Sequence, residues 1–155
     1  LWYKDNKTRV NLMNKNKKIL IVSARYYTDL MDNMEDGAKI VLKDNRNLIS
    51  EYSLFQVTGV FEIPVVISKF IDKFDAFIAL GCVIKGETPH FDFISTSTTD
   101  AIMKISVENK KPVGNGIITC LDKKQAEVRS KQKGREAANA VITVLKELPI
   151  PIHSP

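Results

Sequence analysis

The chain has 155 residues, of which 44% are hydrophobic and 26% charged, a composition typical of one globular domain that excludes a disordered or fibrous protein. No apolar run approaches the roughly 18 residues of a membrane-spanning helix, so no membrane association is expected. The net charge of +5 arises in residues 1–18, and the remainder is balanced. A solvated basic arm is therefore the simpler interpretation, with nucleic-acid binding by that arm as the alternative.

Three segments are expected: a basic arm over 1–18, one domain over 19–148 and a proline-rich tail over 149–155. The arm has no continuous apolar stretch followed by a small-residue cleavage site, so no secretory signal is expected. Cys82 and Cys120 stand alone in apolar runs, without a second cysteine at metal or redox spacing. This pattern predicts two buried thiols in a reducing compartment, and hence a cytoplasmic protein.

The first half of the domain alternates strand and helix patterns. A short β-branched run at 19–22 predicts a strand, and apolar residues spaced three to four apart over 30–41 predict a helix. A second strand is expected over 52–57. The following segment, 63–67, is expected to be helical, because Pro64 is tolerated in a first turn.

The second half repeats the alternation. Residues 76–84 are apolar almost throughout, as in a strand covered on both faces, and 91–109 carries a helical apolar stripe. A fourth strand is expected over 113–119. From Lys123 onward the chain is expected to be helical, with Gly134 dividing it into two helices.

Strands separated by helices of this length predict an α/β fold, a three-layer sandwich with a mostly parallel four-stranded sheet flanked by helices in a flavodoxin-like arrangement. In such sheets ligands bind beyond the carboxyl ends of the strands. The loops at 25–27, 58–62 and 85–90 should therefore lie together and form the site.

Histidine chemistry is expected at His90, because the other histidine, His153, lies in the proline-flanked end. An imidazole with an unperturbed pKa near 6.5 can pass protons at neutral pH. A helix-start histidine with only a local hydrogen bond is the alternative. Thr88 is expected as the N-cap and Pro89 as the first helical residue, and such a helix start can attract an anion, although most bind none.

Charged residues elsewhere leave two interpretations open. Glu62 either accepts hydrogen bonds from a polyhydroxyl ligand or stabilises the helix that follows it. Arg129 and Lys133 form a basic cluster with Lys131 and Arg135 between the expected last two helices, which is either solvated or holds a phosphate. No metal-ligand spacing, dinucleotide fingerprint or Walker motif is present in the sequence.

Four segments, taken together and in order, resemble the 6,7-dimethyl-8-ribityllumazine synthases of riboflavin biosynthesis; they are 57–64, 81–92, 112–118 and 133–138. The resemblance implies condensation of 5-amino-6-(D-ribitylamino)uracil with 3,4-dihydroxy-2-butanone 4-phosphate, without a metal or redox cofactor. It also implies pentamers, or multiples of them, with each site shared between neighbours, and riboflavin synthase as a candidate partner. The arm would add a strand to a neighbour's sheet, as in the family.

By the same resemblance, His90 is the proton-transfer residue. Arg129 would hold the substrate phosphate, and Lys133 matches a lysine near the same site. The remaining substrate-binding positions implied are the helix start at Gly86, Glu87 and Thr88, the stacking ring of Tyr26, the ribityl-contacting Val60, Phe61 and Glu62, the ring-contacting backbone of Val83 and Ile84, and Asn115 from a neighbouring subunit.

This sequence departs from the usual family residue at four positions: Tyr27, Thr58, Val60 and Asn115. The first three alter the shape of the expected pocket. Asn115 replaces an aromatic residue that many members carry, so stacking against the substrate is expected to be weaker. These departures motivate one further alternative, a non-catalytic flavin or lumazine binder on the same scaffold. Asn115 lies near the start of its expected strand, so only a neighbour's site could use it, which implies an obligate oligomer.

Overall fold

The computed structural model describes residues 16–86, 89–146, 149 and 151–153. Most of the predicted arm lies outside this part, as do two predicted binding residues, Glu87 and Thr88. Lys17, the second of the described residues, already opens the first strand, so the last two residues of the predicted arm belong to the domain.

Four strands form one parallel sheet in the order β2-β1-β3-β4, which confirms the predicted α/β class. They are β1 (Lys17–Ala24), β2 (Ile49–Val57), β3 (Ala76–Ile84) and β4 (Val113–Cys120). The first crossover places β2 on one side of β1, and the next returns the chain to the other side. The strand order therefore reverses between β1 and β3, which is where a doubly wound sheet opens a crevice at its carboxyl edge.

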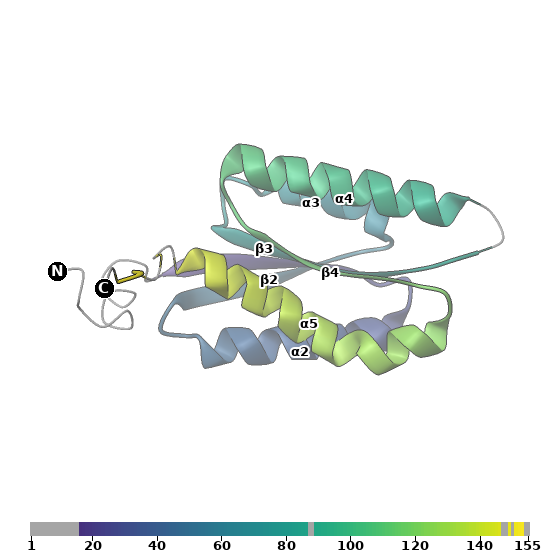
Figure 1. The fold of residues 1–155 in the computed structure, drawn as a ribbon, viewed down its shortest axis with the longest axis horizontal. Helices are drawn as coiled ribbons and strands as arrows, with labels where there is room; N and C mark the ends of the chain where they lie inside the picture. Colours follow the sequence, from purple (N-terminus) through teal and green to yellow (C-terminus); the bar gives the residue numbers. More distant parts are fainter. Residues whose placement is uncertain (1–15, 87–88, 147–148, 150, 154–155) are drawn as a thin grey trace.

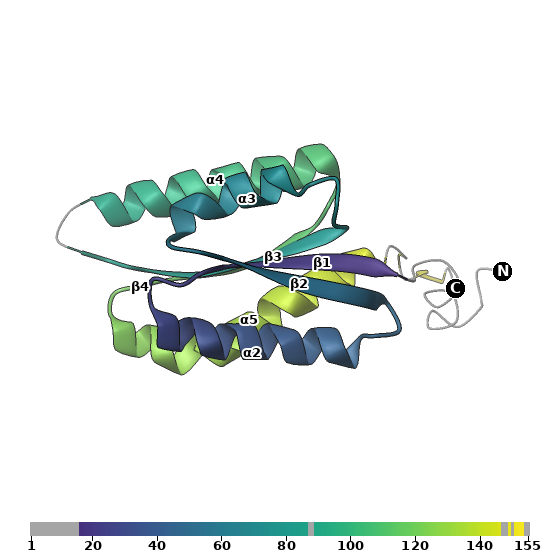
Figure 2. The same cartoon turned by 180° about the vertical axis from the view of Figure 1, so that it is seen from behind.

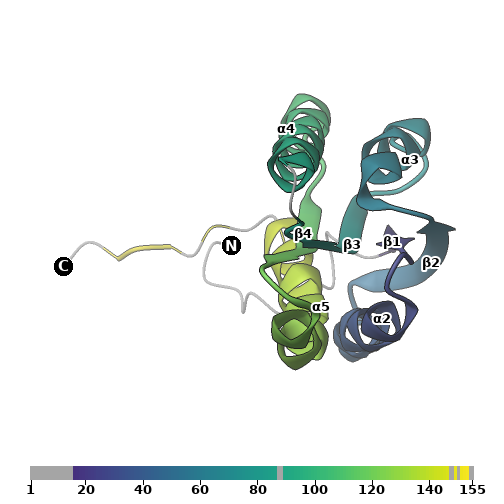
Figure 3. The same cartoon turned by 90° about the vertical axis from the view of Figure 1, so that its right-hand side faces the viewer.

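The helices cover both faces of this sheet, as predicted (Figures 1 and 2). They are α2 (Thr28–Asp44), the 3-10 turn η1 (Val60–Glu62), α3 (Ile63–Lys69), α4 (His90–Asn109) and α5 (Lys123–Leu145). The end-on view shows α2 and α5 on one face and α3 and α4 on the other (Figure 3). Three layers result, with the loops after β1, β2 and β3 at one edge.

Alternation along the strands divides the core between these two faces. In β1, Ile19 and Ile21 belong to the cluster beneath α2 and α5, whereas Leu20 and Val22 belong to the cluster beneath α3 and α4. All four side chains are almost completely buried. A strand buried on both faces reads as a continuous apolar run, which is why β1 and β3 could be located in the sequence.

The predicted division at Gly134 is wrong, because α5 is one continuous helix. A Cβ at Gly134 would lie 2.1 Å from the carbonyl oxygen of Met34 in α2, so glycine is needed here for close helix packing and not for a break. The basic residues Arg129 and Lys133 accordingly share one helix. They do not lie between two.

None of the helices in the described part of the chain combines the length and apolarity required to cross a bilayer.

Candidate active site

A cavity of about 330 Å³ opens at the carboxyl edge of the sheet, between the ends of β1 and β3 where the strand order reverses. Its lining combines residues of all three predicted loops with neighbours in β1, β3 and α4: Ala24, Tyr26, Tyr27, Gly59, Val60, Phe61, Cys82, Val83, Ile84, His90 and Ile94. The expectation that these loops lie together is therefore confirmed. Its volume lies within the range of small-molecule sites, which are concave and mostly apolar.

The cavity wall formed by η1 rests directly on β3. Gly81 makes this possible, since a Cβ there would lie 2.4 Å from Cγ1 of Val60. Val60 is consequently almost buried, at 6% exposure, while its neighbour Phe61 remains 65% exposed. The wall therefore combines a fixed apolar base with an exposed aromatic ring.

The loop after β1 supplies the opposite wall through two tyrosines. Their rings meet edge to face, with centroids 4.9 Å apart and planes at 76°. Tyr26 is 71% exposed, and Tyr27 is half-buried against the core. Burial raises the pKa of Tyr27 above its ordinary value, so its phenol stays protonated further into the alkaline range than a solvated tyrosine. An exposed ring held by a packed neighbour provides a flat surface for stacking.

His90 is the first residue of α4 and the only histidine among those that line the cavity. It is exposed to solvent at the cavity rim. Pro89, expected as the first helical residue, is instead the N-cap, with φ −69° and ψ 4°. The predicted cap Thr88 lies outside the described residues. A histidine at this rim can exchange protons with both bulk water and a bound molecule.

Glu62 has a local role in this structure. Its Oε1 accepts a hydrogen bond from the backbone N–H of Gly59 at 3.0 Å, closing the 3-10 turn that carries Val60 and Phe61. This contact supports the helix-stabilising alternative. Because a carboxylate has two oxygens and about four acceptor sites, the bond also leaves acceptor capacity for a ligand hydroxyl.

Cys82 lines the cavity, although the sequence suggested only a buried thiol. Both cysteines are buried, as predicted, and neither forms a disulfide. Burial, reinforced by Cys120, raises the pKa of the Cys82 thiol to about 12. Because the thiolate is the reactive form, Cys82 contributes apolar surface and not a nucleophile.

The predicted phosphate residues do not line this cavity. Arg129 is exposed on α5, on the other face of the sheet, in a hollow with Asp122, Lys124, Gln125 and Val128. Lys133 lies one turn further along the same helix. Within one chain, therefore, the structure does not bring either cation together with His90.

Asn115 also lies away from His90, near the amino end of β4. It lines a small hollow of about 80 Å³ with residues of α4, and its Oδ1 accepts a hydrogen bond from the backbone N–H of Ile117 at 3.0 Å. Asn115 thus lies near the start of its strand, as expected, and is not among the residues that line the cavity. Gly86, by contrast, lies two residues after the last residue of β3 and is exposed, with no atom near enough to contact an added Cβ.

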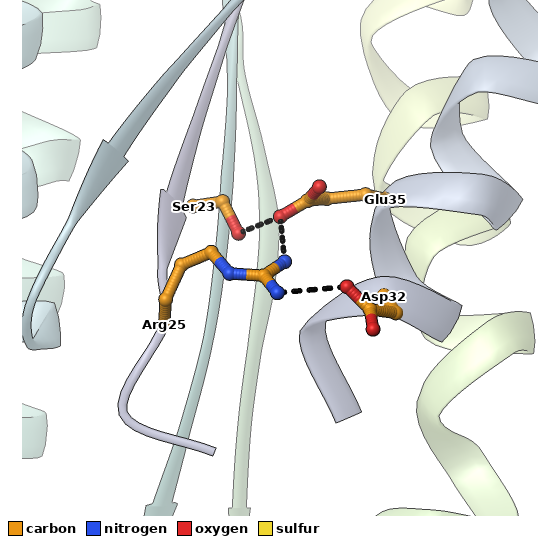
Figure 4. A network of polar contacts seen from close by, with 4 residues as sticks. All are labelled: Ser23, Arg25, Asp32 and Glu35. Atoms are coloured by element: carbon orange, nitrogen blue, oxygen red, sulfur yellow. Dashed lines mark hydrogen bonds and ion pairs between the residues drawn. The ribbon is translucent and has the colours of Figure 1, made fainter. Parts of the chain in front are cut away.

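Sequence analysis missed a polar cluster that adjoins the cavity. Ser23 and Arg25, at the end of β1, bond to Glu35 and Asp32 of α2 (Figure 4). The hydrogen bonds that the Arg25 guanidinium donates to Asp32 and, as the next cause, to Glu35 raise its pKa above the ordinary value. A signal was present in the sequence, because Glu35 falls directly after Met34 and three before Ala38, within the apolar stripe of its helix.

Comparison with known proteins places these residues in context. A family model described as 6,7-dimethyl-8-ribityllumazine synthase matches residues 16–148. The chain is 38% identical over 139 residues to a 6,7-dimethyl-8-ribityllumazine synthase of Agrobacterium fabrum, covering 83% of this chain and 92% of the relative. It is 38% identical over 137 residues to one of Cutibacterium acnes, covering 84% and 81%. It is 39% identical over 140 residues to the 6,7-dimethyl-8-ribityllumazine synthase 1 of Rhodopseudomonas palustris, covering 83% and 84%.

Proposed function

The chain belongs to the 6,7-dimethyl-8-ribityllumazine synthase family, and from this premise we propose how its residues divide the work of the reaction. It is a transferase of riboflavin biosynthesis that condenses 5-amino-6-(D-ribitylamino)uracil with 3,4-dihydroxy-2-butanone 4-phosphate. The products are 6,7-dimethyl-8-ribityllumazine, phosphate and water. The observation that carries the assignment of the site is the cavity shared by His90, Tyr26 and the η1 wall.

His90 transfers protons in this proposal. An amine of the pyrimidine attacks the ketone, phosphate is eliminated and the second ring closes, and each of these steps moves a proton. A positioned general acid–base group typically contributes about 10²–10⁴-fold to such a rate. His90 fits because it lines the cavity at the exposed start of α4, where it can exchange its proton with solvent.

The cavity walls position the pyrimidine substrate. The exposed ring of Tyr26 stacks on the pyrimidine, while the backbone of Val83 and Ile84 contacts its edge. Val60 and Phe61 contact the ribityl chain, and Glu62 accepts a hydrogen bond from one of its hydroxyls. Much of the rate acceleration then comes from holding two reactants in a productive orientation, which lowers a barrier by several kcal/mol.

The phosphate of the second substrate binds to Arg129 and Lys133 in this proposal, together with the helix start at Gly86, Glu87 and Thr88. Arg129 belongs to α5 and His90 to α4, and these two helices cover opposite faces of the sheet of one chain (Figure 3). The two residues line different hollows. In this proposal they act on one substrate, and Arg129, like Asn115, comes from a neighbouring copy. The active unit is therefore an oligomer, and the family resemblance points to a pentamer or a multiple of it.

A cytoplasmic location and an interaction with riboflavin synthase complete the proposal. Two buried thiols without a disulfide agree with a reducing compartment. The partner expectation rests on the family resemblance.

The first experiment is optical. Purified protein is mixed with both substrates, and formation of the lumazine is followed by absorbance against a protein-free control. Saturable formation above the control supports the proposal. The absence of catalysis in folded, oligomeric protein would contradict it.

The shared site is tested by mixing two inactive variants. His90→Ala and Arg129→Ala are each denatured, combined and refolded together, and the activity is compared with that of each variant refolded alone. If one site takes His90 and Arg129 from different copies, about a quarter of randomly formed interfaces regain both residues, and activity returns. Lys123→Ala, which removes an exposed lysine from the same helix, is the matched control and should retain full activity. Failure of the mixture to exceed its components would indicate that both residues act within one chain.

A further inference from the structure

A guanidinium bridges two carboxylates beside the proposed site (Figure 4). Arg25 Nη1 donates to Glu35 Oε2 at 2.8 Å, and Arg25 Nη2 donates to Asp32 Oδ1 at 2.7 Å. Ser23 Oγ donates to the same Glu35 oxygen at 2.7 Å. These bonds join the end of strand β1, and Arg25 just after it, to the first half of α2. The strand that ends at the site and the helix that begins there are therefore held at a fixed separation.

Glu35 is the buried member of this cluster, at 5% exposure, whereas the side chain of Asp32 is 64% exposed. An unpaired carboxylate among the apolar residues of α2 would be strongly unfavourable, so its contacts with Ser23 and Arg25 are required. A buried ion pair nevertheless adds little stability compared with well-packed apolar residues of the same volume. What the pair does provide is directional geometry, because a guanidinium presents its donors in a rigid planar fork.

The position of Arg25 bears directly on the cavity wall that Tyr26 and Tyr27 form. Arg25 immediately precedes Tyr26 and Tyr27, which line the cavity, although Arg25 itself does not. Its backbone N–H also donates to the carbonyl of Val57 at 2.8 Å, at the end of β2. Arg25 is therefore held from three directions, by Val57, Glu35 and Asp32, immediately before the chain turns into the tyrosine wall.

We propose that Glu35 is a positioning residue: through Arg25 it holds the Tyr26–Tyr27 segment in the conformation that receives the pyrimidine. This proposal rests on the proposed function, since it names a determinant of binding at the same site. Glu35 acts through Arg25 and does not touch the substrate. Replacing Glu35 should therefore weaken the affinity for the pyrimidine and the lumazine. It should leave the KM for the butanone phosphate and kcat almost unchanged.

The test begins with Glu35→Gln, which keeps the size of the side chain and an acceptor for Ser23 but removes the charge opposite Arg25. We expect the Kd for 6,7-dimethyl-8-ribityllumazine, measured by calorimetric titration, and the KM for the pyrimidine to rise about tenfold. The KM for the butanone phosphate and kcat should change by less than about twofold. Asp36→Asn removes a neighbouring, exposed carboxylate on the same helix and should change none of these values. Asp32→Asn, at an exposed position, should raise the same Kd by a smaller factor and carries the test if Glu35→Gln does not fold.

A double-mutant cycle with Tyr26→Ala separates positioning from general destabilisation. If Glu35 acts through the tyrosine segment, Glu35→Gln should weaken lumazine binding much less in the Tyr26→Ala background than in the wild type. Equal effects in the two backgrounds would overturn the proposal, as would unchanged lumazine binding by both Glu35→Gln and Asp32→Asn. Absence of lumazine binding by the wild-type protein would instead overturn the proposed function, and this proposal with it.

Discussion

Replacing Gly134 by alanine should lower the stability of the protein, although helix propensity alone predicts that it would raise it. Alanine is about 1 kcal/mol more favourable than glycine in the interior of a helix, so Gly134→Ala would stabilise an isolated α5. In the folded protein the added Cβ would lie 2.1 Å from the carbonyl oxygen of Met34, and 2.9 and 3.0 Å from two further backbone atoms of the same residue. These atoms belong to the backbone of α2 and cannot rotate away.

The magnitude follows from the size of this overlap. Restoring ordinary van der Waals contact requires α2 and α5 to separate by roughly 1 Å along their shared interface. Overpacking of this kind destabilises proteins by about 1–3 kcal/mol, and the rigid backbone on both sides places this substitution toward the upper end. After the favourable propensity term, we expect the free energy of unfolding to fall by about 2 kcal/mol.

Equilibrium unfolding in urea, followed by far-ultraviolet circular dichroism at one protein concentration, measures this change. The midpoint should fall while the m-value stays constant, since the unfolded surface is unchanged. Gln132→Ala, an exposed substitution in the same helix, should stay within about 0.5 kcal/mol of the wild type. Gly37 lies on the α2 side of the same interface, where an added Cβ would lie 2.3 Å from the carbonyl oxygen of Lys131. Gly37→Ala should therefore destabilise the protein as Gly134→Ala does. A Gly134→Ala protein as stable as the wild type would refute the reasoning.

Three further predictions concern the cavity. His90→Ala should lower kcat by about 10²–10⁴-fold while lumazine binding persists, and an equal loss of binding and rate would contradict a role in proton transfer. Gly81→Ala should weaken lumazine binding, because its Cβ would lie 2.4 Å from Cγ1 of Val60. Adding Val60→Ala should restore part of the lost affinity. If the two substitutions instead change the binding free energy additively, the clash is not the cause. Since burial raises the pKa of Cys82 from 9.0 to about 12, the unfolded chain releases this proton first, and stability should fall as pH rises through that interval. Cys82→Ser should show a shallower alkaline decline in the free energy of unfolding, and an identical slope would contradict the raised pKa.

The order of strands and helices, and the edge at which the site lies, could be predicted from local patterns. The run at 76–84 matched β3 (Ala76–Ile84) because burial on both faces leaves few positions for polar residues. The cavity-lining loops followed from the topology, since the carboxyl ends of parallel strands meet at one edge. His90 could be named because only two histidines are present in the sequence.

Contacts between segments distant in the sequence could not be predicted in this way. Gly134 suggested a helix break because its sequence neighbours contain no sign of Met34, and nothing in the sequence around Glu35 shows that Ser23 and Arg25 lie against it. Arg129 and His90 looked like members of one site, yet they lie on different faces of the sheet. The sequence by itself determined the elements and their order, because these depend on hydrophobic periodicity within each segment. Only the tertiary structure decided which side chains meet, because that depends on the separation and register of elements packed from different parts of the chain.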